Sequence, residues 1–345
     1  MPVPGLKFFR KMGCLDMTSA TPASVLKKDV PEPNAVGSFV EMMKLKMVFH
    51  ILITTFVGFY LGSKVELDMP LMWHTLLGTG ILAIGAFALN QAIEKDYDKL
   101  MIRTRTRPLP TNRVSRTAAF VFGLLCFVAG TGYLWVATNT LTAILGGVTL
   151  VLYAVVYTPM KRFSSLNTLV GAIPGALPPL MGWTAVQNNL GIGGLVLAAI
   201  LFFWQLPHFL ALALMYKDDY RLGGFQMLSV TDPSGEACYR HIIIQTLILV
   251  LVSVFPFLFR LAGPWYLACA LIGGGYFLLA GVTLSRRRTR ESARVLFFTS
   301  LIYLPILLLV MAWDKAILFV LLFSNRLSAV LTKKIPHSLE FPTCP

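Results

Sequence analysis

The chain has 345 residues, of which 56% are hydrophobic and only 13% are charged, and its formal net charge is +14. Soluble domains carry about 25% charged residues, so the composition excludes an ordinary soluble protein. The positive charge would suggest nucleic-acid binding in a soluble protein, but its placement in the loops described below excludes that interpretation.

Apolar runs of roughly 18 to 25 residues recur along the chain, and each is long enough to cross a bilayer as a helix. We predict nine spans, near residues 43–62, 71–93, 117–137, 141–158, 166–186, 191–215, 240–261, 265–284 and 295–313. The connections between them are short and polar. The sequence therefore predicts an all-α fold, a polytopic helical membrane bundle formed by residues 41–314.

Basic residues gather in the loops that follow the even-numbered spans, whereas the opposite loops carry only Lys64 and Arg260. Because Lys and Arg are enriched in cytoplasmic loops, this bias places the long connections 94–116 and 216–239 in the cytoplasm. We expect a bacterial plasma membrane, with the mitochondrial inner membrane as the alternative.

The two ends of the chain differ from the spans in composition. Residues 1–40 lack the apolar core of a secretory signal and have no convincing transit-peptide character, so we predict a cytoplasmic tail. Residues 315–345 hold a short apolar run and a basic tail, and we assign no structure to this C-terminal extension.

The second span ends in a column of polar side chains. Asn90, Glu94 and Asp98 are four residues apart, so they share one face of a helix. Such a column is costly in a membrane protein unless it binds a cation, and oxygen ligands favour Mg²⁺ with phosphate as a co-ligand. The alternative is a solvated helix end with scattered charges. We favour the metal site, because the column continues the line of an apolar span.

A basic run, Met101 to Pro110, follows the column. Arg103 and Arg107 come close to the carboxylates in sequence, and arginine can bind phosphate oxygens through paired N–H groups. The same arginines also set the membrane topology, so both interpretations stay open. Together with the acidic column, the run suggests a diphosphate bound at a membrane surface.

The connection after the fourth span contains Tyr157, Lys161 and Arg162, and the fifth span begins at Asn167. Lys161 and Arg162 are topology residues by default. The fifth span is rich in glycine and proline, for which we predict a bent and closely packed helix.

The sixth span carries His208 behind Pro207 and ends at Lys217, Asp218 and Asp219. A histidine in an apolar span needs a hydrogen-bond partner or a ligand, and an internal hydrogen bond is the more common solution. The two aspartates could hold a second metal ion. Because adjacent helical residues point about 100° apart, only one of them is expected to ligate.

Three blocks of sequence, residues 90–110, 157–183 and 202–228, closely resemble the heme O synthases, the protoheme IX farnesyltransferase family of the UbiA superfamily. The resemblance runs from about residue 40 to Asp314. The motif from Trp204 to Phe209 and the motif from Tyr216 to Tyr220 point to the heme branch. The central acid of the first motif is usually aspartate in this family and is Glu94 here.

The resemblance implies Mg²⁺-dependent transfer of a farnesyl group from farnesyl diphosphate to a vinyl group of heme B, with addition of water, giving heme O for terminal oxidase assembly. It implies the lipid bilayer as surroundings, heme A synthase as a candidate partner and no nucleic acid. The catalytic residues that it implies are Asn90, Glu94, Asp98, Lys161 and Asp219. The implied metal ligands are Asn90, Glu94, Asp98, Asp218 and Asp219. The implied substrate-binding residues are Arg103, Arg107, Arg162, Lys217, Asn167, His208 and Tyr157, with His208 contacting heme.

Two other functions compete with this one. A UbiA enzyme acting on a quinone precursor would carry a clear DxxxD repeat in residues 216–239, which the sequence lacks. A membrane transporter would line a continuous path with polar groups, whereas the polar clusters of this chain gather on one predicted face.

Overall fold

The structure is a computed structural model that describes the backbone of residues 34–63 and 66–333 and the side chains up to Ile317. Most of the predicted tail, residues 1–40, lies outside the described residues, as do Cys14, Lys64 and Cys344. All regular structure in the described part of the chain is helical, which confirms the predicted fold class.

The helices follow the predicted spans closely. In chain order they are α1 (Ala35–Met43), α2 (Leu45–Gly62), α3 (Met69–Asp98), α4 (Arg116–Ala137), α5 (Thr140–Val151), α6 (Thr158–Met160), α7 (Asn167–Gln187), α8 (Ile192–Met215), α9 (Lys217–Leu222), α10 (Leu228–Thr231), α11 (Glu236–Val252), α12 (Phe255–Leu258), α13 (Pro264–Arg287) and α14 (Arg290–Lys333). A π-helical segment, Leu152–Tyr157, joins α5 to α6. Within the described residues, nine helical spans are long and apolar enough to cross a membrane.

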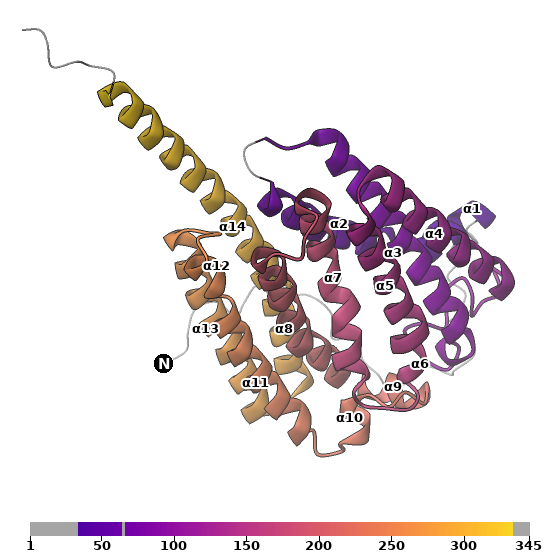
Figure 1. Cartoon of the computed structure of the whole chain (residues 1–345). Coiled ribbons are helices and arrows are strands. Elements are labelled where there is room, and N and C mark those ends of the chain that lie inside the picture. The colour runs from indigo at the N-terminus through magenta and orange to yellow at the C-terminus, as the bar shows by residue number, and fades with distance from the viewer. Residues whose placement is uncertain (1–33, 64–65, 334–345) are drawn as a thin grey trace, which may run out of the picture.

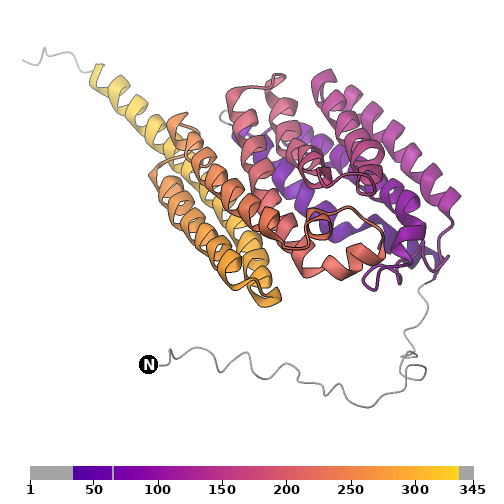
Figure 2. The same cartoon turned by 90° about the horizontal axis from the view of Figure 1, so that it is seen from below.

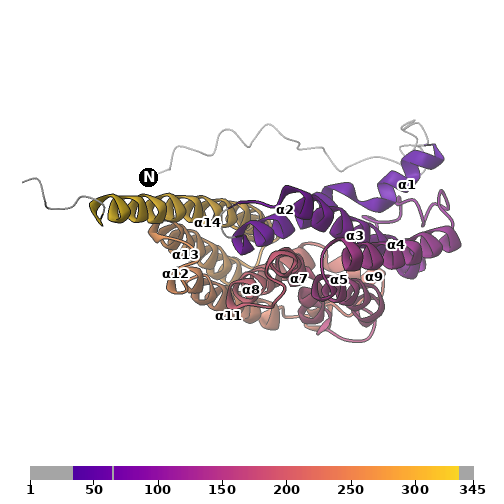
Figure 3. The same ribbon diagram turned by 45° about the horizontal axis from the view of Figure 1, so that its top comes forward.

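The spans form two groups that meet at α7. One apolar core joins α2, α7, α8, α11, α13 and α14, and a second joins α3, α4, α5 and α7. Figure 2 shows the orange and yellow C-terminal helices on one side of the bundle and the violet helices on the other. In Figure 3, α1 and the end of α14 lie at opposite ends of the molecule. The short helices α6, α9 and α10 cover one face of the bundle (Figure 1).

Helix α14 is longer than the ninth predicted span. Its apolar span is Arg290–Ile317, and the helix continues to Lys333. The domain boundary expected after residue 314 therefore falls inside a continuous helix, which runs beyond its neighbours α12 and α13 (Figure 1).

The Asp314–Lys315 pair of α14 joins three helices at the face opposite α9. The Asp314 carboxylate accepts a hydrogen bond of 2.7 Å from the backbone N–H of Tyr266, in the first turn of α13. Lys315 donates to backbone carbonyls at the end of α2, including that of Ser63 at 2.6 Å. Helix ends leave such backbone groups without partners, so these side chains cap two helices from a third.

Helices α2 and α7 approach so closely that only glycine fits at their crossing. A Cβ atom on Gly58 would collide with the backbone of Pro179, and one on Gly182 would collide with the carbonyl group of Thr55. Small residues allow helix backbones to come together in this way. The predicted close packing of the fifth span follows from these two positions.

We therefore expect Gly182→Ala to lower the stability of the purified protein by about 2 kcal/mol, because the new methyl group forces α2 and α7 apart. Unfolding in detergent, followed by the fraction of monodisperse protein against temperature, measures the effect. Gly132→Ala in α4 is the matched control, since no atom lies within 4 Å of its Cβ position. The control should be neutral or slightly more stable because alanine favours the helix, and equal losses in both variants would contradict the argument.

Candidate active site

The polar column at the end of α3 is buried and faces a single cavity. Asn90, Glu94 and Asp98 are exposed by only 2%, 5% and 0%. All three line a cavity of about 330 Å³, together with side chains from the segment after α1, the loop after α3, the π-helical segment and the 216–227 region. The four-residue spacing thus aligns the three oxygens along one wall, as the sequence predicted.

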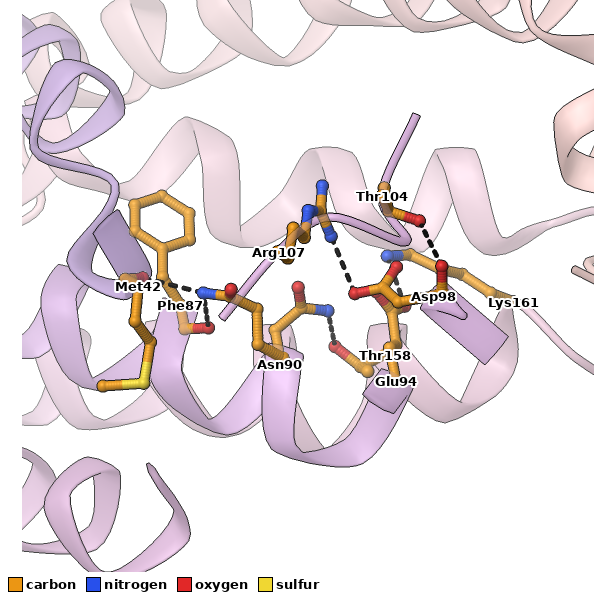
Figure 4. Close-up of polar contacts among 10 residues, drawn as sticks. Met42, Phe87, Asn90, Glu94, Asp98, Thr104, Arg107, Thr158 and Lys161 are labelled. Carbon is orange, nitrogen blue, oxygen red and sulfur yellow. Dashed lines mark hydrogen bonds and ion pairs between the residues drawn. The ribbon is translucent and has the colours of Figure 1, made fainter. Parts of the chain in front are cut away.

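Each member of the column has one partner from another segment (Figure 4). The Asn90 amide donates to the Thr158 hydroxyl at 3.0 Å, the Lys161 ammonium donates to Glu94 at 2.7 Å, and the Arg107 guanidinium donates to Asp98 at 2.9 Å. The fold therefore brings together six residues, from α3, from the loop after it, and from α6 and the residue that follows α6.

Thr158 fixes the orientation of the Asn90 side chain. Its hydroxyl donates to the carbonyl of Tyr153 at 2.8 Å, the same carbonyl that accepts the backbone N–H of Thr158, so the hydroxyl oxygen accepts from the Asn90 amide nitrogen. The amide oxygen of Asn90 is then left for the cavity. A short π-helical segment is often found at functional sites, and here it supplies two tyrosines of the cavity wall and ends directly before Thr158, the partner of Asn90.

The two oxygens of the Asp98 carboxylate differ in their hydrogen bonding. Its Oδ2 atom binds Arg107, whereas Oδ1 is buried with no hydrogen-bond partner within the described part of the chain. A buried carboxylate oxygen without a partner is costly, so its presence is typical of a site that receives a ligand. The loop after α3 closes over Asp98, whose backbone carbonyl accepts from Thr104 at 2.9 Å.

Cations surround the column. Burial by itself would lower the pKa of Lys161, but the Glu94 carboxylate and the neighbouring Tyr157 and Tyr153 outweigh it, and the pKa is raised above its usual value. Lys161 is therefore an ammonium ion, with its charge 4.4 Å from the centre of the Tyr157 ring.

Lys44 is a cavity residue to which the sequence analysis gave no role. It lies between α1 and α2 in the left-handed conformation, with φ 52°, and lines the same cavity. Its ammonium group is 5.2 Å from the centre of the Phe87 ring. The signal in the sequence was a basic residue at the start of the first predicted span, 43–62, which topology alone explains equally well.

Arg103 lies at the mouth of the cavity and stacks on aromatic rings of the 216–220 segment. Its guanidinium carbon is 5.1 Å from the ring centre of Tyr216 and 5.9 Å from that of Tyr220. Burial raises the pKa of Tyr220, which keeps its hydroxyl neutral. Arg107 contacts the column at Asp98, and Arg103 lines the same cavity from the same loop, whereas phosphate binding by the two arginines stays a prediction.

The second acidic pair does not reach this cavity. The Asp219 carboxylate accepts from the backbone N–H groups of Ile102 and Arg103, each at 3.2 Å, and so holds the loop after α3 in place. The side chain of Asp218 is 92% exposed and lies 3.6 Å from Arg221. Metal binding by this pair remains a prediction, and the geometry gives Asp219 a different contact.

Three of the predicted substrate-binding residues make contacts within the protein. Arg162 stacks 4.0 Å from the centre of the Tyr97 ring. The Asn167 amide donates to the carbonyls of Ser164 and Gln226 at 2.6 and 2.9 Å, and Lys217 donates to the carbonyl of Pro233 at 3.1 Å. These contacts hold the loop-side segments together, and none of the three residues lines the cavity of the column.

His208 is satisfied inside the bundle. Its Nδ1 atom pairs with the Ser300 hydroxyl at 2.7 Å, and its ring stacks between Trp204 and Phe297. The residue is 9% exposed and lines neither of the two cavities found on the loop-side face. Its contact with heme stays a prediction that this arrangement does not favour.

The donor atoms of the column fit a small, hard cation. The amide oxygen of Asn90, the Glu94 carboxylate and the free Oδ1 of Asp98 are oxygen ligands of the kind that Mg²⁺ prefers, with other positions left for water or phosphate. The described residues contain no group of three or more His, Cys, Asp or Glu side chains able to enclose a metal. The site therefore suits an ion whose ligand shell is completed by a phosphate-bearing molecule.

Comparison with known proteins places this geometry in a family. Residues 51–302 match the UbiA prenyltransferase family model. The chain is 40% identical over 286 residues to the protoheme IX farnesyltransferase of Solibacter usitatus, covering 80% of this chain and 98% of that protein. It is 38% identical over 279 residues to the human mitochondrial protoheme IX farnesyltransferase, covering 81% of this chain and 62% of that protein.

Solved structures share the fold at low sequence identity. A digeranylgeranylglyceryl phosphate synthase superposes with a TM-score of 0.69 at 18% identity, covering 81% of this chain and 98% of that one. A UbiA homologue from Archaeoglobus fulgidus, bound to DMAPP and Mg²⁺, superposes with a TM-score of 0.61 at 15% identity, covering 81% and 99%.

The buried ion pair between Lys161 and Glu94 gives a test of the site that does not depend on activity. Lys161→Met leaves the Glu94 carboxylate without its cation, and we expect the protein to lose about 2 kcal/mol of stability. This is less than the roughly 3–5 kcal/mol lost when a fully dry ion pair is broken, because the cavity admits water. The measurement is thermal unfolding in detergent. Adding Glu94→Gln to the variant should restore part of the loss.

The matched control is Lys99→Met, which removes an exposed lysine 3.7 Å from Asp96 on the same helix. Exposed pairs contribute little, so this change should stay within about 0.5 kcal/mol. A Lys161→Met protein as stable as the wild type would show that the pair does not hold α6 against α3.

Proposed function

Because this chain belongs to the UbiA prenyltransferase family, we propose that it transfers a farnesyl group from farnesyl diphosphate to a vinyl group of protoheme IX and adds water, giving heme O. The observation that carries the proposal is the cavity at the end of α3, where three oxygen ligands face several cations. The relatives named protoheme IX farnesyltransferase match over most of the chain and support heme as the acceptor.

The cations of the cavity would receive the diphosphate. Arg107 uses one of its five N–H donors on Asp98, and Lys161 uses one of its three on Glu94, so both keep donors for phosphate oxygens. Lys44 and Arg103 add two more basic side chains at the same cavity. Their fixed positions would stabilise the negative charge that develops on the leaving oxygen.

The α3 column would hold magnesium beside the diphosphate, through Asn90, Glu94 and Asp98. A bound ion supplies charge neutralisation for the leaving diphosphate. Asp219 stays a proposed catalytic residue through the loop that it anchors, since its carboxylate binds the backbone of Arg103.

The bond changes are those of an ionisation followed by an addition. The carbon–oxygen bond to diphosphate breaks, and the farnesyl allylic cation that remains is attacked by the electron pair of the vinyl group. Water then adds to the porphyrin-side cation and loses a proton. Tyr153, Tyr157 and Phe225 line the cavity, and their ring faces would stabilise the allylic cation and limit access of water.

The enzyme is a multi-pass membrane protein. Its motif loops are proposed to face the cytoplasm of a bacterium, because those loops carry the basic residues. A mitochondrial inner membrane is the alternative, in line with the human relative. Heme A synthase, which would consume heme O, remains a predicted partner.

The direct test incubates membranes containing the full chain with heme B, farnesyl diphosphate and Mg²⁺, and identifies the heme product by mass. We expect a hydroxyethylfarnesyl product that disappears when a chelator removes the metal and returns when Mg²⁺ is restored. Farnesylation of a quinone precursor in place of heme would contradict the proposal.

Asp98→Asn should lower turnover by at least about 100-fold, because it removes a charged ligand from the proposed metal site. Mutating only the hydrogen-bond partners of metal ligands already lowers metal affinity or activity by about 10- to 100-fold. Asp96→Asn, on the same helix but paired with Arg116 at the surface, is the matched control. Turnover in the control should equal that of the wild type. Full activity in the Asp98→Asn variant would contradict the proposed mechanism.

Thr158→Val should raise the Mg²⁺ concentration for half-maximal activity about tenfold, since Asn90 loses the partner that orients its amide. Thr158→Ser keeps the hydroxyl and should restore the wild-type value. A purely structural role for Thr158 would lower stability without moving the metal dependence.

A further inference from the structure

A second and larger cavity lies beside the first on the same face of the protein. It has a volume of about 630 Å³ and is lined by the end of α8, by α9, by the 233–235 turn, and by the facing ends of α11, α13 and α14. Arg103 lines both cavities, so the two sites adjoin at that side chain. In Figure 2 the segment that carries α9 and α10 crosses this face.

The lining of this second cavity combines apolar walls with a basic edge. Leu214, Met215, Leu284 and Ala293 form apolar surface, and Tyr216 and Tyr239 add ring faces. Its charged residues are Arg103, Lys217, Arg288, Arg290, Asp218 and Asp219. Four basic side chains outnumber the two carboxylates, and Asp219 also accepts hydrogen bonds from backbone N–H groups, so the lining carries net positive charge.

The other three basic residues of the second cavity keep hydrogen-bond donors for a ligand. Arg288 pairs with Glu236 and stacks on Tyr239, with its guanidinium carbon 5.2 Å from the ring centre. Lys217 uses one donor on the carbonyl of Pro233. Within the described part of the chain, Arg290 has no carboxylate or hydrogen-bonding partner for its guanidinium group. An arginine of this kind suits a carboxylate, which it can bind through two parallel hydrogen bonds.

We infer that this second cavity binds the heme acceptor, with the propionate carboxylates at Lys217, Arg288 and Arg290 and the opposite, vinyl-bearing edge directed toward Arg103. The inference rests on the proposed function and names the acceptor half of the same reaction site. Heme B carries its two propionates on one edge and its vinyl groups across the ring, so holding the propionates at the α13–α14 connection points a vinyl group at the donor cavity.

The surroundings of His208 agree with this placement. Both ring faces of His208 are covered by Trp204 and Phe297, and Ser300 takes its Nδ1 atom. A flat tetrapyrrole would have to displace these contacts to reach the imidazole. The second cavity needs no such rearrangement, because its apolar and charged side chains already line an open space.

The test is an optical titration of the purified full-length protein with heme B and with heme B dimethyl ester, in the absence of farnesyl diphosphate. We expect Arg290→Gln to weaken heme binding about tenfold, the effect of losing one charged hydrogen bond at a partly exposed site. Binding of the dimethyl ester should be the same in the variant and in the wild type. Arg290→Lys should recover part of the heme affinity.

Arg294→Gln is the matched control, because this exposed arginine lies one turn further along α14 and does not line the cavity. It should bind heme as the wild type does. Equal weakening for heme and its dimethyl ester in Arg290→Gln would overturn the inference, as would unchanged heme binding. The inference also fails if the variant alters binding of an anionic phospholipid and leaves heme binding intact.

Steady-state kinetics separate this inference from the proposed function. In Arg290→Gln the KM for heme should rise about tenfold while the KM for farnesyl diphosphate stays unchanged. A wild-type protein that binds heme through Arg290 and forms no farnesylated heme would refute the function alone. A variant that forms heme O with an unchanged KM for heme would refute the acceptor site alone.

Discussion

Buried negative charge at the end of α3 is the constraint on which the loop-side structure depends. Two carboxylates, Glu94 and Asp98, lie almost fully inside a membrane protein, where an uncompensated charge is costly. Each is neutralised by a cation from another segment, Lys161 after α6 and Arg107 in the loop after α3. The chain must therefore fold both segments back over the helix end, and the cavity forms between them.

A second layer of contacts keeps those cations where they are. Asp219 binds the backbone at Ile102 and Arg103, and the backbone N–H of Gln226 donates to the carbonyl of Lys161 at 2.6 Å. The 216–227 segment thus anchors both cation-bearing segments of the column. Because Arg103 also borders the second cavity, the same segment connects the proposed diphosphate and heme sites. The loops on this face must consequently stay in place for the proposed reaction to occur.

Hydrophobicity and residue spacing predicted the spans and the α3 column, because both depend on contacts along one helix. The residues that sequence reasoning missed or placed differently depend on contacts between helices. Lys44 reaches the cavity only because the chain turns with a positive φ between α1 and α2. His208 finds its partner Ser300 on α14, and Asp219 finds its partners in the loop after α3. No local pattern specifies these pairings.

The sequence by itself determined that this protein is a helical membrane bundle, that its charged loops share one face, and that Asn90, Glu94 and Asp98 lie in line, since these properties follow from apolar length, charge and the period of a helix. Only the tertiary structure decided which cation neutralises each carboxylate, that Asp219 supports a loop, and that two adjoining cavities exist. Those features arise where residues distant in sequence must satisfy one another's charges and hydrogen bonds away from water.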